Sequence, residues 1–387
     1  MAPDDLDVPP SQVEWHRLLL GLAGRLPDDL ISEARTWVAQ GRLAEAAQGI
    51  AYAAATGGVP VSDAQAALLA RTLRAAGEDS DALAQLDRAD VELMPPFEMA
   101  PANAAVLHEH GDAIPATLDL TGGHDEVAGP DGIDVAAVAA AGREPEIIGL
   151  WRAWRFPTGQ SRWPAPKRIY LATVRPGLAT AVDERTGAAP VAALTDRLQA
   201  ALLTAGETSP QVEVSGEGDD LPVYQRMARA CAALLWTSSA RPGIRLARVF
   251  DRVDAGSGPR FEPDHPRLTD QTEREQVQAY LLGGTVLLYT TALMDDVVEP
   301  ANTGRVPMSF RTDGAWIWTD TVHYYLATHL LAPDADLLTH IRNQRFEVPV
   351  PDSVALHRAM AVLQAPQPEP VWTVGGADPQ AAAPSGA

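Results

Sequence analysis

The densest group of chemically capable side chains lies within residues 306–329, VPMSFRTDGAWIWTDTVHYYLATH. A guanidinium, two carboxylates, two indole rings and two imidazoles fall close together there. A tight turn at Asp313-Gly314 is expected to place Arg311 and Trp316 on neighbouring strands, where their side chains can touch. Such a group could form a binding surface, or it could bury itself against a sheet. The aromatic content favours burial in the core.

Two carboxylates, Asp295 and Asp296, follow the apolar segment TVLLYTT at residues 285–291. The C-terminal end of a central strand is a common place for a metal ligand or a general base in α/β enzymes. The more ordinary interpretation is an acidic loop or a helix cap. If this half of the chain holds a pocket, the sequence predicts that it is formed by Arg311, Asp313, Trp316, Trp318, Asp295, Asp296 and His323.

The other candidate motifs carry little chemistry. His108 and His110 would share one side of a strand, but no third metal ligand stands near them. The loop Gly216-Glu217-Gly218 lacks the glycine spacing of a dinucleotide-binding loop, and its acids would repel phosphate. The single cysteine, Cys231, falls in an apolar helical pattern that is typical of a buried residue. The sequence therefore predicts no metal site, no cofactor and no catalytic residues.

An aromatic and basic cluster follows an acidic stretch of the chain, and it consists of Trp151, Arg152, Trp154 and Arg155. Indole rings and guanidinium groups could bind a carboxylate or a nucleotide. They could equally dock the acidic N-terminal half of the chain onto the C-terminal half. We favour interdomain docking, because the charges of the two halves are complementary at this point.

The chain is strongly acidic, and its charge is unevenly distributed. The net charge is −21 over 387 residues. Residues 1–150 contain 25 acidic and 8 basic residues, whereas residues 151–387 contain 26 and 22. Such a field repels phosphate backbones, so nucleic acid is not an expected partner. The field could steer a basic protein, but the favoured interpretation is that the acidity keeps an alanine-rich chain soluble. A protein partner is expected, without an indication of its identity.

No apolar run approaches the ~20 residues that a membrane helix needs, so no membrane association is expected. The first ten residues, MAPDDLDVPP, have neither the basic start nor the apolar stretch of a secretion signal. The expected location is the cytoplasm. Export without a signal would leave no mark in the sequence.

Pattern and composition divide the chain into five parts, and the expected class is a multi-domain α+β protein. Residues 1–10 are predicted to be a disordered tail. Residues 11–94 are predicted to form a helical-hairpin bundle, with a capping box at Ser11 and Glu14. Residues 95–146 read as an acidic connector rich in Gly and Pro. Residues 147–366 are predicted to form a mixed sheet with helices packed on it, and residues 367–387 a second disordered tail.

Three elements of the C-terminal half matter for the candidate pocket. Residues 221–238 show the period of one long amphipathic helix. The segment at 285–291 is apolar enough to be a central strand. The Asp313-Gly314 turn between residues 306–311 and 315–318 predicts a β-hairpin.

Two stretches, residues 15–54 (WHRLLLGLAGRLPDDLISEARTWVAQGRLAEAAQGIAYAA) and residues 284–342, resemble a family of conserved actinobacterial proteins of unknown function. Some members of that family are encoded near type VII secretion or polymorphic-toxin genes. The resemblance implies an actinobacterial source with a GC-rich genome. It assigns no functional residue.

Two hypotheses of function follow. The first is a non-catalytic interaction protein, an adaptor or an accessory or immunity-type factor that binds another protein. It rests on segregated charge, a helical N-terminal part and the lack of a catalytic residue set. The alternative is an enzyme or small-molecule binder whose pocket lies at the C-terminal ends of the strands.

Overall fold

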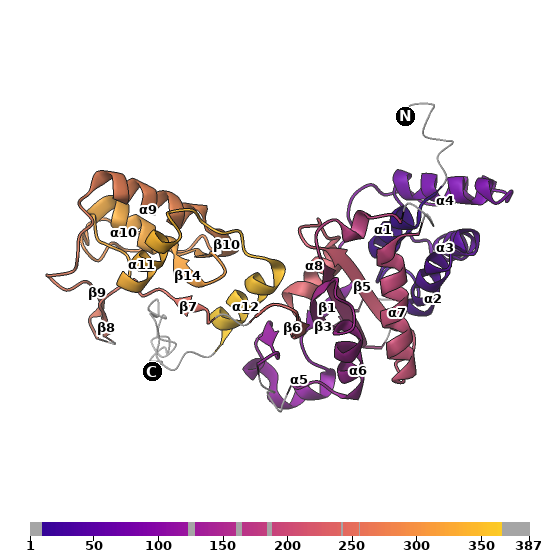
Figure 1. Cartoon of the computed structure of the whole chain (residues 1–387), viewed down its shortest axis with the longest axis horizontal. Coiled ribbons are helices and arrows are strands. Elements are labelled where there is room, and N and C mark those ends of the chain that lie inside the picture. The colour runs from indigo at the N-terminus through magenta and orange to yellow at the C-terminus, as the bar shows by residue number, and fades with distance from the viewer. Residues whose placement is uncertain are drawn as a thin grey trace, which may run out of the picture. The chain divides into compact units, whose positions relative to one another are not determined.

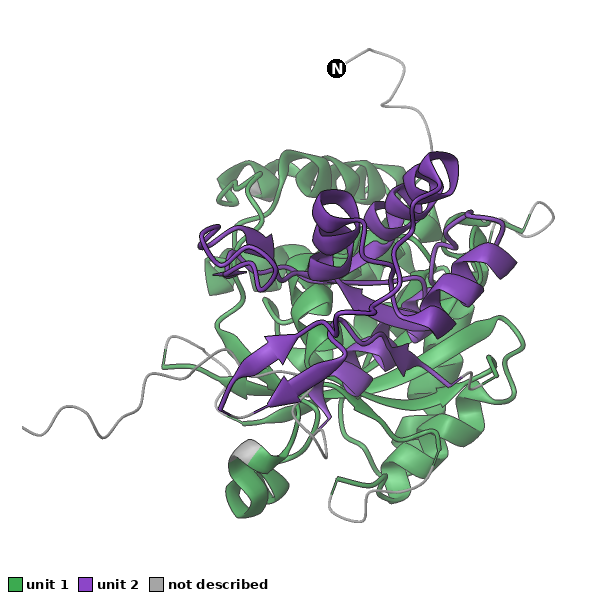
Figure 2. Ribbon diagram, turned by 90° about the vertical axis from the view of Figure 1, so that its left-hand side faces the viewer, with its two compact units in different colours: residues 1–241 green, residues 242–387 purple. Residues whose placement is uncertain are grey.

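The computed structural model describes residues 10–122, 128–159, 165–183, 188–240, 243–254 and 256–365. Figure 1 follows the chain from N- to C-terminus. The chain forms two compact units, residues 1–241 and 242–387, which are coloured separately in Figure 2. Apart from Pro10, the tails predicted at residues 1–10 and 367–387 lie outside the described residues.

Four helices open the first unit: α1 (Gln12–Leu22), α2 (Asp28–Ala39), α3 (Leu43–Gly57) and α4 (Asp63–Ala75). The capping box predicted at the start of α1 is confirmed. The Ser11 hydroxyl accepts a hydrogen bond from the Glu14 amide at 3.2 Å, and the Glu14 carboxylate accepts one from the Ser11 amide at 2.9 Å. Ser62 and Gln65 form the same arrangement before α4. Each box satisfies amide groups that the first helical turn leaves without partners.

The N-terminal helices share one hydrophobic core with a sheet. Both α1 and α2 pack on α7 (Pro190–Thr204), and α2 also contacts strand β5 (Gln211–Gly216). The same core contains Leu19 of α1, Ile31 of α2 and Val214 of β5, all nearly inaccessible to solvent. The domain boundary predicted near residue 146 therefore falls inside the first unit. The helices bury their apolar faces against α7 and β5, so they do not form a bundle of their own.

A six-stranded sheet forms the centre of the first unit. Its strands run in the order β2-β6-β3-β4-β5, and β1 also pairs with β3. The contact between β3 and β4 is antiparallel, and that between β4 and β5 is parallel. Figure 1 shows α2, α3 and α7 on one side of these strands. The remaining bounds are β1 (Phe97–Ala100), β2 (Leu118–Asp119), β3 (Ile147–Pro157), β4 (Lys167–Val174) and β6 (Ala233–Thr237).

Residues 95–146, predicted as a connector, contribute to this sheet. They contain β1 and β2, together with helices α5 (Ala104–His110) and α6 (Gly132–Ala141). His108 and His110 lie in α5, not on a strand. Strands of four and two residues are too short to show the alternation by which strands are predicted. β1 is a strand because it pairs with β3, and β2 is a strand because it pairs with β6.

The prediction of one long helix over residues 221–238 is also wrong. Helix α8 spans only Val223–Ala230, and the chain then enters β6. Ala233 and Leu234 are completely buried there, between β2 and β3. A short apolar run suits a buried strand or a buried helix equally well, so neighbouring strands decide its conformation.

The second unit is built around a four-stranded sheet in the order β10-β13-β14-β7. These strands are β7 (Arg245–Leu246), β10 (Thr285–Leu288), β13 (Phe310–Thr312) and β14 (Trp316–Thr319). The predicted hairpin is confirmed, because β13 and β14 are antiparallel neighbours. Gly314 supplies the positive φ, +90°, that the turn between them requires.

Helices α9 (Gln271–Gly283), α10 (Asp320–His329), α11 (Ala335–Asn343) and α12 (Ser353–Gln364) accompany this sheet. The core contains Trp318 from β14, Leu326 from α10 and Ile341 from α11. Two small two-stranded sheets pair β8 (Arg252–Asp254) with β9 (Gly258–Arg260) and β11 (Leu293–Met294) with β12 (Val306–Pro307).

The apolar strand β10 lies at an edge of the sheet, whereas the sequence predicted a central position. Val286 and Leu288 are exposed to 47% and 45%. A β-bulge between them shifts their register against β13.

Together the two units make the chain an α+β protein, as predicted. Within the described residues, no helix combines the length and the apolar character needed to cross a membrane.

His16 provides a partner for one backbone carbonyl at the β5 edge of the first sheet. It is buried on α1, and its Nε2 lies 2.8 Å from the carbonyl oxygen of Val214 in the edge strand β5. Because a carbonyl only accepts hydrogen bonds, Nε2 carries the proton. Burial lowers the pKa of His16 to about 4, so the ring is neutral in the folded protein near pH 7.

We predict that His16 makes the fold sensitive to acid. An unfolded chain takes up a proton on this ring near pH 6.5, but the folded chain does so only near pH 4. The neutral ring therefore makes its full contribution to the free energy of unfolding above pH 6.5. As the pH falls from 6.5 towards 4, that free energy decreases by roughly 3 kcal/mol. Urea titrations at pH 7 and pH 4.5 should show a smaller loss in His16→Gln, whose amide can still donate to Val214. The same pH dependence in both proteins would contradict this assignment.

Candidate functional site

The turn of the β13–β14 hairpin brings Asp313 together with two residues that the sequence did not single out. Its Oδ2 accepts hydrogen bonds from the Tyr280 hydroxyl of α9 at 2.6 Å and from Nε2 of His340 of α11 at 2.7 Å. Its Oδ1 accepts from the amides of Ala315 and Trp316, each at 2.8 Å. Four donors therefore hold this buried carboxylate in one position.

The hydrogen bonds to Asp313 indicate where the protons of Tyr280 and His340 lie. Burial, and then the hydrogen bond to Asp313, raise the pKa of the Tyr280 hydroxyl, which stays protonated. Since Asp313 can only accept, the proton sits on Nε2 whenever the ring of His340 is neutral. Nδ1 is then the acceptor nitrogen, and none of the described residues hydrogen-bonds to it.

A pocket of about 300 Å³ lies beside His340. It is lined by Arg245, Trp316, Asp336, Thr339, His340 and Asn343. An imidazole oriented by a carboxylate can accept a hydrogen bond or move a proton. The Thr339 hydroxyl donates to the carbonyl of Ala335 at 2.8 Å, so its proton is not directed at His340.

Arg311 makes contacts that hold elements of the fold together. Its Nε donates to Asp320 at 2.6 Å, and its Nη1 donates to the carbonyls of Leu282 and Gly284 at the end of α9. His323 lies near this pair. The pKa of His323 is lowered overall. Burial is the main cause, and Arg311 adds to it, while Asp320 opposes it. The structure therefore brings Arg311 and His323 together around Asp320.

Asp296 and Asp295 are used elsewhere. Asp296 is buried and accepts from His329 at 2.6 Å and from the Tyr324 hydroxyl at 3.1 Å. Burial raises its pKa, but these bonds and two backbone amides outweigh that effect and lower it. Asp295 accepts from the amide of Gly304 at 2.8 Å. Both carboxylates hold the loop that follows β11.

The two predicted tryptophans differ in their surroundings. Trp318 is fully buried, and its Nε1 donates to the carbonyl of Leu281 at 3.0 Å. Trp316 lines the pocket beside His340, with ring centroids 6.2 Å apart. Of the seven residues predicted to share one pocket, only Trp316 lines the one beside His340, and Asp313 supports it from behind. The others belong to separate contacts.

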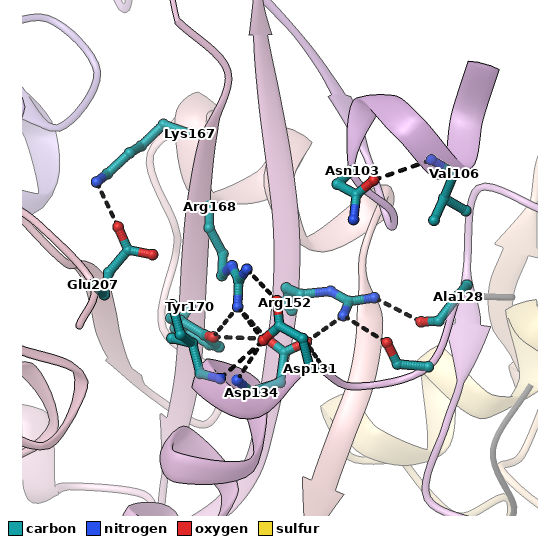
Figure 3. A network of polar contacts seen from close by, with 12 residues as sticks. Asn103, Val106, Ala128, Asp131, Asp134, Arg152, Lys167, Arg168, Tyr170 and Glu207 are labelled. Carbon is teal, nitrogen blue, oxygen red and sulfur yellow. Dashed lines mark hydrogen bonds and ion pairs between the residues drawn. The ribbon is translucent and has the colours of Figure 1, made fainter. Parts of the chain in front are cut away.

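The aromatic and basic cluster of β3 lies within the first unit. Figure 3 shows Arg152, Arg168 and Tyr170 converging on Asp134 of α6. Arg152 pairs with this carboxylate, Arg168 Nη1 donates to it at 3.1 Å, and the Tyr170 hydroxyl donates at 2.6 Å. Arg168 also pairs with Asp131 at 2.5 Å. The network fastens α6 to the sheet.

Arg155 makes a second tether. It pairs with Asp28 of α2 at 2.5 Å, and its guanidinium lies 4.6 Å from the centre of the Phe97 ring. Trp151 and Trp154 stack under Arg229 and Arg168, at 3.4 Å and 4.8 Å. Arg152 and Arg155 thus bind carboxylates of the acidic N-terminal half, but inside one compact unit and not between two.

Comparisons with protein-family models, curated proteins and solved structures found no match to this chain. The resemblance to an actinobacterial family stays a prediction. Within the described part of the chain, no three His, Cys, Asp or Glu residues are placed to hold a metal ion.

The residues missed by sequence reasoning are Tyr280, His340 and Asp336. Tyr280 and His340 are separated by 60 positions and meet only through the packing of α9 and α11. The only local signal is the spacing of Asp336 and His340, four apart on a helix and therefore on one face.

We predict that Asp134 contributes much more to stability than a surface carboxylate does. Asp134→Ala removes the acceptor shared by two buried guanidinium groups, and we expect a loss of about 3–5 kcal/mol in the free energy of unfolding. The control is Glu146→Ala, which breaks an exposed pair with Arg175 at 3.2 Å and should cost less than about 1 kcal/mol. Urea titration measures both, and equal losses would show that the network does not hold the unit together.

Proposed function

We propose that this chain is a non-catalytic protein-binding protein, which engages a partner by adding a strand of the partner to the free edge of β10. The observation that carries the proposal is the exposure of an apolar strand at the end of a sheet. Among the strands that the structure describes, β10 pairs only with β13. An edge strand offers backbone N–H and C=O groups to a second chain.

The exposed apolar side chains continue beyond the strand. Tyr289 is 74% exposed and Leu293 is 54% exposed, next to Val286 and Leu288 on β10 itself. Single exposed apolar residues are ordinary, but several within eight positions of one edge are typical of an interaction surface. Backbone pairing would supply affinity and these side chains would supply specificity.

The contacts of the predicted pocket residues also support a binding role. Arg311, Asp295 and Asp296 each hold neighbouring segments of the fold, and they do not converge on a cavity. The net charge of −21 disfavours nucleic acid as the partner and favours a neutral or basic protein.

We predict that a photo-crosslinking residue in place of Tyr289 captures a partner in a lysate of the native host. The same residue in place of Tyr52, an equally exposed tyrosine of α3 at 72%, serves as the control and should capture none. Adding Leu288→Lys to the Tyr289 variant should reduce capture at least about tenfold, because a buried ammonium opposes strand addition.

Two results would contradict the proposal. One is equal capture from positions 289 and 52. The other is capture at 289 that Leu288→Lys leaves unchanged while the circular dichroism spectrum stays native.

A further inference from the structure

The pocket beside His340 already holds a cation from its own chain. The guanidinium carbon of Arg245 lies 5.5 Å from the centre of the Trp316 ring, within the range of a cation–π contact. Its Nη1 lies 3.7 Å from Oδ2 of Asp336. The shape and the polarity of this pocket therefore accommodate a guanidinium.

Arg245 is held weakly. Its side chain is 65% exposed and that of Asp336 is 76% exposed. Among the described residues, none forms a hydrogen bond with the Arg245 guanidinium. An exposed ion pair at this distance contributes little, since solvent screens it and two side chains lose freedom. A second cation can displace Arg245 at small cost.

The rest of the pocket suits a cation. Trp316 offers the face of an indole, the aromatic ring that cations prefer. Asp336 offers a carboxylate, and His340 offers Nδ1, which is an acceptor in the neutral ring because Nε2 donates to Asp313. Asn343 adds an amide group at the wall. The acceptors and the aromatic face together form a site for a planar guanidinium or a compact ammonium group.

An anion fits less well. Arg245 could attract one, but Asp336 stands in the same pocket and the buried Asp313 lies behind the imidazole of His340. The second unit as a whole contains 18 acidic and 11 basic residues, so its field also opposes an anion.

We propose that the pocket formed by Trp316, Asp336, His340 and Asn343 binds the guanidinium or ammonium group of a ligand, such as an arginine or lysine side chain, and that Arg245 is an internal competitor for the same place. The ligand group takes the position of Arg245 over the indole and pairs with Asp336. This inference does not depend on strand addition at β10, because Arg245 lies on β7 at the other end of the sheet and the contact is of a different kind.

The test is a ligand-detected NMR titration of the full-length chain with Nα-acetyl-L-arginine amide. The neutral isostere Nα-acetyl-L-citrulline amide is the matched control, and Nα-acetyl-L-aspartate amide probes for an anion site. We expect the arginine probe to bind wild type weakly, Arg245→Ala about fivefold more tightly, and Asp336→Asn in either background at least about fivefold less tightly. Asp264→Asn removes an exposed carboxylate outside the pocket and controls for net charge.

The proposal is overturned if citrulline binds as well as arginine, if Arg245→Ala leaves the affinity for the arginine probe unchanged, or if the aspartate probe binds in its place. It is also overturned if Asp264→Asn weakens binding as much as Asp336→Asn does. Arg245 and Asp336 are exposed, so both variants should keep the native fold, and their circular dichroism spectra check this.

Discussion

The unpaired backbone groups at the edge of a β-sheet need partners, and the two units of this chain meet that need differently. In the first unit, contacts to the edge strand β5 come from helices of the same unit. His16 donates to the carbonyl of Val214, and Arg35 of α2 forms a buried ion pair with Glu213 at 2.6 Å. This requirement brings the N-terminal helices onto the sheet. In the second unit the edge strand β10 keeps apolar side chains exposed, and on our proposal a partner completes it.

Much of the local structure could be predicted from the sequence, because short-range chemistry decides it. The capping box at Ser11 and the hairpin at Asp313-Gly314 depend on residues within a few positions of each other. The failures have a common cause. Residues 233–237 form a strand, and residues 285–288 lie at an edge, because of neighbours that are distant in the sequence. Apolar content indicates that a segment can be buried, but not which element covers it.

The same reasoning explains the candidate site. Asp313 was recognised from its turn, but its partners Tyr280 and His340 come from two helices and meet through packing. Arg311 and Asp296 have the residue types of a catalytic site, yet their hydrogen bonds hold backbone carbonyls and amides in place. Charged residues near a strand end therefore do not identify a site until their partners are known.

The shared carboxylate of Asp134 has a consequence for how this protein can evolve. Arg152, Arg168 and Asp134 are each buried, and the loss of one leaves a charge of the others uncompensated. A joint replacement by apolar residues of similar volume leaves no such charge behind, and in other proteins it has cost little. Single steps away from the network are therefore disfavoured, while a coordinated change is permitted. These three positions should show strong epistasis and should vary together among descendants of this sequence.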